Sequence, residues 1–163
     1  MRTAILIREL SYGGSQLNAI NLAGYLTMEK KLITDLIVLK PRNDYKDSHK
    51  QYFKKINVYF LTKHYAINLI EVFFSRVKMM IKLYLLIKKN KYKTLITETQ
   101  YYSYYLTVLY AKLFKIKSVL VVGNAFSQLF SNRKPLYLFH VFLHNMALLF
   151  ADQIVCVSYG TRL

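Results

Sequence analysis

The sequence predicts a doubly wound α/β domain with a mainly parallel sheet. Six short apolar runs alternate with helical segments along the 163 residues, which is the order of βαβ units. The runs contain little polar alternation, as expected of parallel strands covered on both faces. A turn with two adjacent glycines, Gly13 and Gly14, joins the first run to the first helix. In such domains ligands bind beyond the carboxyl ends of the strands, so the fold also predicts where a site lies.

The opening unit of strand, turn and helix covers residues 3–30. Ser15 is positioned to cap the helix through its side-chain oxygen. Ala19, Ala23 and Leu26 then recur at helical spacing, which places small side chains on the face that meets the sheet. We therefore expect this helix to lie close on the sheet.

The remaining elements follow in regular alternation. Further strands are expected at 35–39, 57–61, 94–97, 118–122 and 153–157. Helices are expected at 68–89, 101–114 and 135–150. The last of these begins at Pro135, a residue that favours the first helical position.

The charge of the chain is strongly positive, with 24 Lys and Arg against 8 Asp and Glu, a formal net charge of +16. Such a charge attracts polyanions, either nucleic acid or an anionic membrane surface. No helix-turn-helix, RNA-recognition or zinc motif is present, so we expect no nucleic-acid partner. No uncharged apolar run reaches the roughly 18 to 20 residues of a membrane-spanning helix.

The helix expected at 68–89 is unusual because its polar residues are concentrated in one narrow stripe. The stripe consists of Glu71, Ser75, Lys78 and Lys82. Nearly every other residue is apolar, and Lys88 and Lys89 form a basic end. An apolar helix with a basic end is typical of an interfacial membrane contact. The alternatives are a buried crossover helix and a compositional bias towards lysine.

The Gly13-Gly14 turn, with Ser15 and Gln16 after it, is a candidate phosphate or sugar site. Glycines let backbone N–H groups approach a ligand, and a helix N-terminus favours negative charge. The alternative is a tight turn that needs only a positive φ. The spacing is not G-x-G-x-x-G and no acidic residue ends the second strand, so a dinucleotide fingerprint is absent. A phosphate-binding P-loop is also absent.

Polar residues follow three further strands of the predicted sheet. Glu98 and Gln100 follow the fourth strand, Asn124 follows the fifth and Ser158 follows the sixth. The carboxyl ends of parallel strands meet at one edge, so these side chains are candidates for one substrate cleft. A carboxylate there can orient a hydroxyl or act as a base. The alternatives are that Glu98 is a solvated loop residue and that Asn124 and Ser158 only form turns.

No metal site is expected. His140 and His144 lie four residues apart on a helix, but no acidic or Cys partner is near them in the sequence, which favours a packing role. The single Cys156 excludes a disulfide within the chain and fits a cytosolic setting. Cys156 lies in an apolar strand, so we expect a buried thiol and not a nucleophile.

Two motifs, in this order, resemble a known family. The glycine turn is followed by L-A-x-x-L at residues 22–26, and A-D-x-I-V-x-V-S closes the chain at 151–158. Together they resemble the N-terminal half of a family-4, GT-B-fold glycosyltransferase, over essentially the whole chain. The resemblance implies a Rossmann-like acceptor-side domain at residues 1–163, truncated at its C-terminus because the donor-binding domain with its paired glutamates is absent.

The resemblance further implies a retaining transfer of a sugar from a nucleotide sugar to a glycan or lipid-linked acceptor, without a cofactor. Gly13 and Gly14 match the loop that approaches the donor diphosphate. The acceptor cleft would contain Ser15, Gln16, Glu98, Gln100, Asn124 and Ser158. Many members end the fifth strand with a His near the transferred sugar, whereas this chain has Gly123-Asn124 there.

Such enzymes often serve polysaccharide or lipid-linked oligosaccharide synthesis, so we expect a cytoplasmic protein, peripheral at the inner face of the cell membrane. We expect no activity from residues 1–163 without a donor-binding domain. The alternative is a non-catalytic membrane-docking or scaffold module of the same fold that partners a separate donor-binding chain. The sugar, the acceptor and the linkage are not indicated by the sequence.

Overall fold

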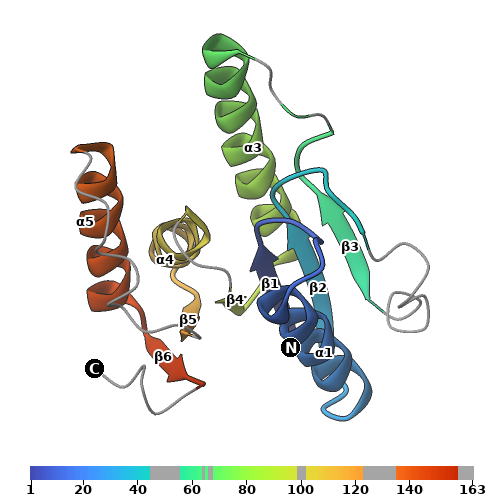
Figure 1. Cartoon of the computed structure of the whole chain (residues 1–163). Coiled ribbons are helices and arrows are strands. Elements are labelled where there is room, and N and C mark those ends of the chain that lie inside the picture. The colour runs from blue at the N-terminus through green and yellow to red at the C-terminus, as the bar shows by residue number, and fades with distance from the viewer. Residues whose placement is uncertain (45–55, 64, 66–67, 99–101, 123–134, 158–163) are drawn as a thin grey trace.

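The computed structural model describes residues 1–44, 56–63, 65, 68–98, 102–122 and 135–157, with the backbone alone for 135–141. The described residues form one six-stranded, fully parallel sheet in the order β3-β2-β1-β4-β5-β6 (Figure 1). The strands are β1 (Arg2–Ile7), β2 (Ile33–Val38), β3 (Asn57–Phe60), β4 (Thr94–Thr97), β5 (Lys117–Val122) and β6 (Gln153–Cys156). The helices are α1 (Gly14–Met28), α3 (Leu69–Asn90), α4 (Tyr102–Phe114) and α5 (Pro135–Phe150). The predicted fold class is confirmed.

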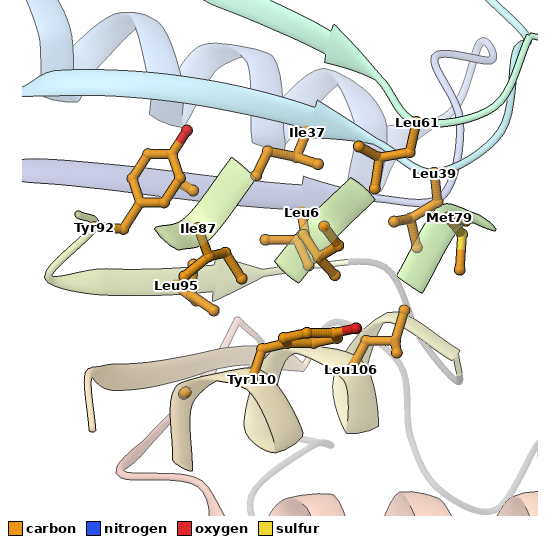
Figure 2. Packing of buried hydrophobic residues seen from close by; sticks show 13 residues of the cluster. Leu6, Ile37, Leu39, Leu61, Met79, Ile87, Tyr92, Leu95, Leu106 and Tyr110 are labelled. Atoms are coloured by element: carbon orange, nitrogen blue, oxygen red, sulfur yellow. The ribbon is translucent and has the colours of Figure 1, made fainter. Parts of the chain in front are cut away.

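Strand β1 lies at the centre of the sheet and sends alternate side chains to two separate cores. Ile5 and Ile7 pack with α1 on one face. Ala4 and Leu6 pack with α3 and α4 on the other face, where Figure 2 shows Leu6 among the residues of these helices. Because both faces of β1 are covered, its sequence is a continuous apolar run, as the sequence predicted.

Helix α1 lies close on the sheet because its inner face is made of small side chains. Ala19, Ala23 and Gly24 are all buried, together with Ile20. This arrangement confirms the packing that the helical spacing predicted.

The topological switch point of the sheet lies between β1 and β4. The chain runs from β1 outwards to β2 and β3, and then returns through α3 to β4 on the other side of β1. The Thr97 hydroxyl donates a 2.8 Å hydrogen bond to the Leu6 carbonyl, so the ends of the two strands are joined. In open α/β sheets ligands bind in the crevice at this point.

At the amino ends of the strands, opposite the switch-point crevice, Asp35 of β2 is completely buried. Its carboxylate accepts hydrogen bonds from Arg2 Nε (2.8 Å), Asn57 Nδ2 (2.9 Å) and the Tyr92 hydroxyl (2.6 Å). Arg2 also forms an ion pair with it, at 2.7 Å. A buried charge must be paired and hydrogen-bonded, and this one is held by three separate segments of the chain.

The acidic residue of the closing motif, Asp152, has a structural role in this fold. Its carboxylate accepts hydrogen bonds from the Ser118 N–H (2.8 Å), the Ser118 hydroxyl (2.7 Å) and Lys112 Nζ (2.6 Å). The Ser118 hydroxyl in turn accepts a bond from the Asp152 N–H at 3.0 Å. These bonds fix the start of β6 against the start of β5 and the end of α4.

Among the described strands, β6 is the last in the sheet order and pairs with β5 alone. Ile154, Val155 and Val157 are consequently exposed by a third or more. Cys156 is only half-buried, so the prediction of a fully buried thiol was wrong. Its strand has one neighbour instead of two, which leaves more of each side chain accessible.

Candidate functional site

The loop between β1 and α1 is fixed by main-chain bonds to the segment after β2. The N–H of the buried Leu10 donates to the Arg42 carbonyl at 3.0 Å, and the Asp44 N–H donates to the Leu10 carbonyl at 2.7 Å. The Asp44 side chain accepts a bond from Arg42 Nε at 2.8 Å and another from the Tyr12 N–H. These bonds lower the pKa of Asp44. The residue before the glycine pair is therefore held in place.

The backbone conformation does not require a glycine at position 13 or at position 14. Gly13 is the N-cap of α1 with an extended φ of −177°, and among the described glycines none has a positive φ. The alternative of a turn that needs positive φ was therefore wrong. A Cβ at Gly13 would lie 2.5 Å from the flexible Gln16 Oε1, whereas a Cβ at Gly14 would meet nothing within 4 Å. Nothing within the described chain demands a glycine at position 14.

The predicted cap by Ser15 was also wrong. The helix begins at Gly14, and its N-cap Gly13 makes no side-chain cap bond. Ser15 is already the second helical residue, and its hydroxyl donates to Gln16 Oε1 at 3.0 Å. The first helical bond runs from the Leu17 N–H to the Gly13 carbonyl. The preceding N–H groups point out of the helix end, where the helix dipole favours an anion.

Glu98 follows β4 directly and is buried, with 7% of its surface exposed. The alternative of a solvated loop residue was therefore wrong. Burial raises the pKa of Glu98, and a hydrogen bond from the Asn18 side chain of α1 acts in the opposite direction. Helix α1 therefore supplies both the glycine end and the partner that orients this carboxyl. At the switch point, the first turns of α1 are thus connected to the carboxyl that follows β4.

Tyr104 of α4 contacts the neighbouring strand β5 near its carboxyl end. Its hydroxyl donates a 2.6 Å hydrogen bond to the Val121 carbonyl at the end of β5. Burial raises the pKa of Tyr104, and the neighbouring Glu98 and Cys156 add to this. The ring of His144 stacks on it at 5.1 Å, which agrees with the predicted packing role.

His144 is buried, and burial lowers its pKa. The side chain of His140 lies outside the described residues. Within the described part of the chain, no three His, Cys, Asp or Glu side chains come together as metal ligands would.

Three of the predicted site residues fall outside the described residues: Gln100, Asn124 and Ser158. The structure brings Gly13, Gly14, Ser15 and Gln16 together at the start of α1, and Asn18 connects that helix to Glu98. Sequence reasoning missed Asn18. A polar residue one helical turn after Gly14 was the available signal, because positions four apart share a face.

A separate open pocket of about 510 Å³ lies where β3 ends and α3 begins. Its helical wall is the polar stripe that the sequence indicated: Glu71, Ser75, Lys78 and Lys82. The other wall is made by Leu61, Thr62, Lys63 and Tyr65, and apolar surface is added by Ile70 and Phe74. The Lys82 Nζ donates to the Leu61 carbonyl at 2.9 Å, which joins the two walls.

No protein-family model and no curated protein sequence matches this chain. Solved structures do match its fold. MurG of Acinetobacter baumannii is 11% identical over 100% of this chain, with a TM-score of 0.68 and 43% of its own length covered. UGT2 of Phytolacca americana, complexed with UDP-2fluoro-glucose and pterostilbene, is 11% identical over 97% of this chain, with a TM-score of 0.68 and 47% of its length covered.

The fold is half of a GT-B fold. The UDP-GlcNAc 2-epimerase of Methanocaldococcus jannaschii shares it as well, with 14% identity over 99% of this chain, a TM-score of 0.59 and 40% of its length covered. The chain therefore spans less than half the length of each of these proteins. These neighbours include transferases and an epimerase. The likeness therefore shows the architecture of the chain and does not specify a reaction.

Proposed function

We propose that this chain is the acceptor-side half of a retaining glycosyltransferase of the family-4 type, which moves a sugar from a nucleotide sugar to a glycan or lipid-linked acceptor. The observation that supports the proposal is the hydrogen bond from Asn18 to Glu98, which connects the helix that begins at Gly14 to the carboxyl after β4. Gly14 leaves open space at a helix N-terminus, and Glu98 is a buried carboxyl oriented by Asn18 from the same helix.

Each part of this arrangement has a chemical role in sugar transfer. The backbone at Gly13 and Gly14 can approach a diphosphate closely, and the positive end of α1 stabilises its charge. Glu98 lies where it can orient an acceptor hydroxyl or accept its proton. Burial raises the pKa of Glu98 above its ordinary value, which makes its carboxylate a stronger proton acceptor. No cofactor beyond the nucleotide-sugar substrate is needed.

The proposal includes a second domain that holds the nucleotide. The GT-B proteins that this chain resembles are more than twice as long as the matched region. Holding both substrates in one geometry supplies on the order of 7 to 11 kcal/mol in favourable cases. Residues 1–163 without a donor-binding domain should therefore show no measurable transfer.

The test is release of nucleoside diphosphate from a panel of nucleotide sugars. One arm uses residues 1–163, and the other uses a longer chain in which a donor-binding domain follows them. We expect turnover in the second arm only. Robust turnover by residues 1–163 would show that the donor site is misplaced in this proposal.

We propose a location at the inner face of the cytoplasmic membrane, with α3 as the contact. Among the described helices none combines the length and apolarity needed to span a membrane. The outward face of α3 nevertheless carries large apolar side chains that are more than half exposed: Leu69, Ile70, Phe73, Phe74, Ile81 and Leu85. A peripheral contact gives this surface an apolar environment.

The same surface favours a second candidate, a non-catalytic membrane-docking module that partners a separate donor-binding chain. The two functions differ in one measurement. A transferase half supports turnover once the donor-binding domain is attached, whereas a docking module binds membranes but supports no turnover in either arm.

A further inference from the structure

Helix α3 carries apolar side chains on two opposite sides. Met79, Leu83 and Ile87 are buried and pack into the core. On the other side of the helix, four apolar side chains recur at steps of four, three and four residues and are all more than a third exposed: Ile70, Phe74, Val77 and Ile81. We call these four residues the outer seam. Because the helix turns once in 3.6 residues, this spacing keeps the outer seam on one narrow line.

The spacing of the outer seam is typical of packing between two helices. Steps of four and three residues average 3.5, and a line with this period stays against a second helix that winds around the first. Within the described part of the chain, the outer seam is left exposed to solvent. The pattern therefore indicates that the partner of this surface is a helix.

The outer seam lies where a second molecule can reach it. Residues 69–78 contain no buried side chain, and Figure 1 shows the first turns of α3 projecting past the ends of β1, β2 and β3. Asn68 caps this projecting half, since its Oδ1 accepts the Glu71 N–H at 2.8 Å and its Nδ2 donates to the Glu71 carboxylate at 3.2 Å. A capped end keeps the helix formed where it has no core contacts.

The outer seam is complementary to itself when two copies of α3 run antiparallel. With a twofold axis between residues 75 and 76, Ile70 faces Ile81 of the second copy. In the same register Phe74 faces Val77 of the second copy. Every apolar layer of the seam is then filled by an apolar side chain, and the interface is isologous.

The residues that flank the outer seam match in the same arrangement. On one flank Glu71 lies beside Lys78 of the second copy, and the symmetry repeats this pair. On the other flank Phe73 meets Met80 of the second copy, and both side chains are more than a third exposed. In a parallel pair Lys78 would instead lie beside Phe73 of the second copy. The charges therefore favour the antiparallel arrangement.

We propose that the outer seam joins two copies of this chain as an antiparallel helix pair. The inference does not depend on the proposed sugar transfer. In solution the second copy covers the face proposed above to meet a membrane, so the two contacts exclude each other. One helical face offers fewer residues than the roughly 20 to 30 per side of a standard interface, so we expect a dissociation constant on the order of 10 µM. The net charge of +16 on each copy is screened beyond about 8 Å at physiological ionic strength.

The test is sedimentation equilibrium of residues 1–163 at physiological salt, without lipid or detergent. Phe74→Asp places a charge in the outer seam and should weaken the dimer about 100-fold, since the residue occurs twice at the interface. Leu85→Asp is the matched control, because Leu85 lies on the same helix beyond the overlap and is 55% exposed, against 57% for Phe74. The control should dimerise within about threefold of the unmodified chain. Neither residue is buried, so both variants should keep the far-UV circular dichroism of the unmodified chain.

A charge exchange tests the antiparallel register. Glu71→Lys or Lys78→Glu alone brings two like-charged pairs together and should weaken the dimer about tenfold. The double variant Glu71→Lys/Lys78→Glu restores both pairs and should dimerise within about threefold of the unmodified chain. A double variant as weak as the single ones would overturn the register.

Two further outcomes would overturn the proposal. Equal weakening by Phe74→Asp and Leu85→Asp would show that the outer seam is not the interface. An unmodified chain that stays monomeric at about 100 µM would overturn the dimer itself. If that monomer bound vesicles, the same face would belong to the membrane contact alone.

Discussion

The Tyr92 hydroxyl donates a 2.6 Å hydrogen bond to the Asp35 carboxylate across 57 residues of sequence. The Arg2 guanidinium pairs with the same carboxylate and lies 5.5 Å above the Tyr92 ring. Burial raises the pKa of Tyr92 and the bond to Asp35 raises it further, so the phenol stays protonated and remains a donor. The link between α3 and β4 is thereby attached to β1 and β2.

Tyr92→Phe should destabilise the fold by about 1.5 to 3 kcal/mol, the range for a hydrogen bond to a charged group. The substitution keeps the buried ring and removes only the donor to the Asp35 charge. Urea unfolding measures the change. Tyr25→Phe is the matched control, because Tyr25 is half exposed, and its change should stay within about 0.5 kcal/mol. Equal effects of the two variants would contradict the assigned role of the Asp35 cluster.

Asp152→Asn should lower stability at neutral pH and remove a pH-dependent part of it. Hydrogen bonds from Lys112 and Ser118 lower the pKa of Asp152 to about 2. A lowered folded pKa gives stability that is present above the ordinary value of 3.8 and is lost as pH falls through about 2. Because the side chain is 33% exposed, solvent screening limits the contribution to about 1 kcal/mol.

The measurement is urea unfolding of both proteins at several pH values between neutral and about 2. The difference between them should be largest above about pH 4 and should shrink towards pH 2. Glu29→Gln, at an exposed position, serves as the control for a lost negative charge. A difference that does not vary with pH would be inconsistent with the Asp152 charge as the cause.

Gly14→Val should leave folding intact and impair sugar transfer. A Cβ at this position meets nothing within 4 Å, so the folded chain can accept the larger side chain. The new side chain blocks approach to the end of α1, and we expect at least a tenfold lower kcat/KM in the longer, donor-domain-containing chain, about 1.4 kcal/mol. Nucleoside diphosphate release measures transfer, and Gly14→Ala should show a smaller loss. Full activity of the Val variant would limit the turn to a structural role.

Glu98→Gln should raise the stability of the fold at neutral pH and lower the rate of sugar transfer. Burial raises the pKa of Glu98, so ionisation opposes folding increasingly as pH rises from the ordinary value through the folded one. At neutral pH the uncharged Gln should therefore make the fold more stable, while at about pH 4 the two proteins should be alike. Transfer by the longer chain should fall about 100-fold or more if the carboxyl handles a proton.

Asn18→Ala is the companion variant for Glu98. It removes the hydrogen bond to the carboxyl without touching its charge. We expect a smaller loss of transfer than for Glu98→Gln, together with a pH optimum shifted upwards, because a bond that lowers the pKa of Glu98 is gone. An unchanged pH profile would show that Asn18 does not position this carboxyl.

The strands and helices could be predicted because each is specified by a local pattern. Uninterrupted apolar runs identified β1 and β5, and Pro135 identified the start of α5. The polar stripe of α3 was also visible from spacing, and it became one wall of the pocket. These features depend on residues at most a few positions apart.

Most of the errors and omissions involve contacts between distant segments. Nothing near Asp35 in the sequence indicates Tyr92, and nothing near Glu98 indicates Asn18, because each pair comes together only when the sheet forms. The exposure of Cys156 depended on the place of β6 in the strand order, which the sequence does not specify. The Ser15 cap was wrong because the helix begins two residues earlier than such a cap requires, with Gly13 as its N-cap.

Because β1 lies between β2 and β4, it stays without one of its two neighbours until the ribosome has made β4. β1 is made before the other described strands, but the hydrogen bond from Thr97 to Leu6 joins residues 91 positions apart. At a synthesis rate of about 5 to 20 residues per second, β4 follows β1 after a delay on the order of ten seconds. During that time the edge of β1 is an unpaired apolar template of the kind that chaperones shield. The crevice beside Glu98 therefore cannot form until the ribosome has delivered β4.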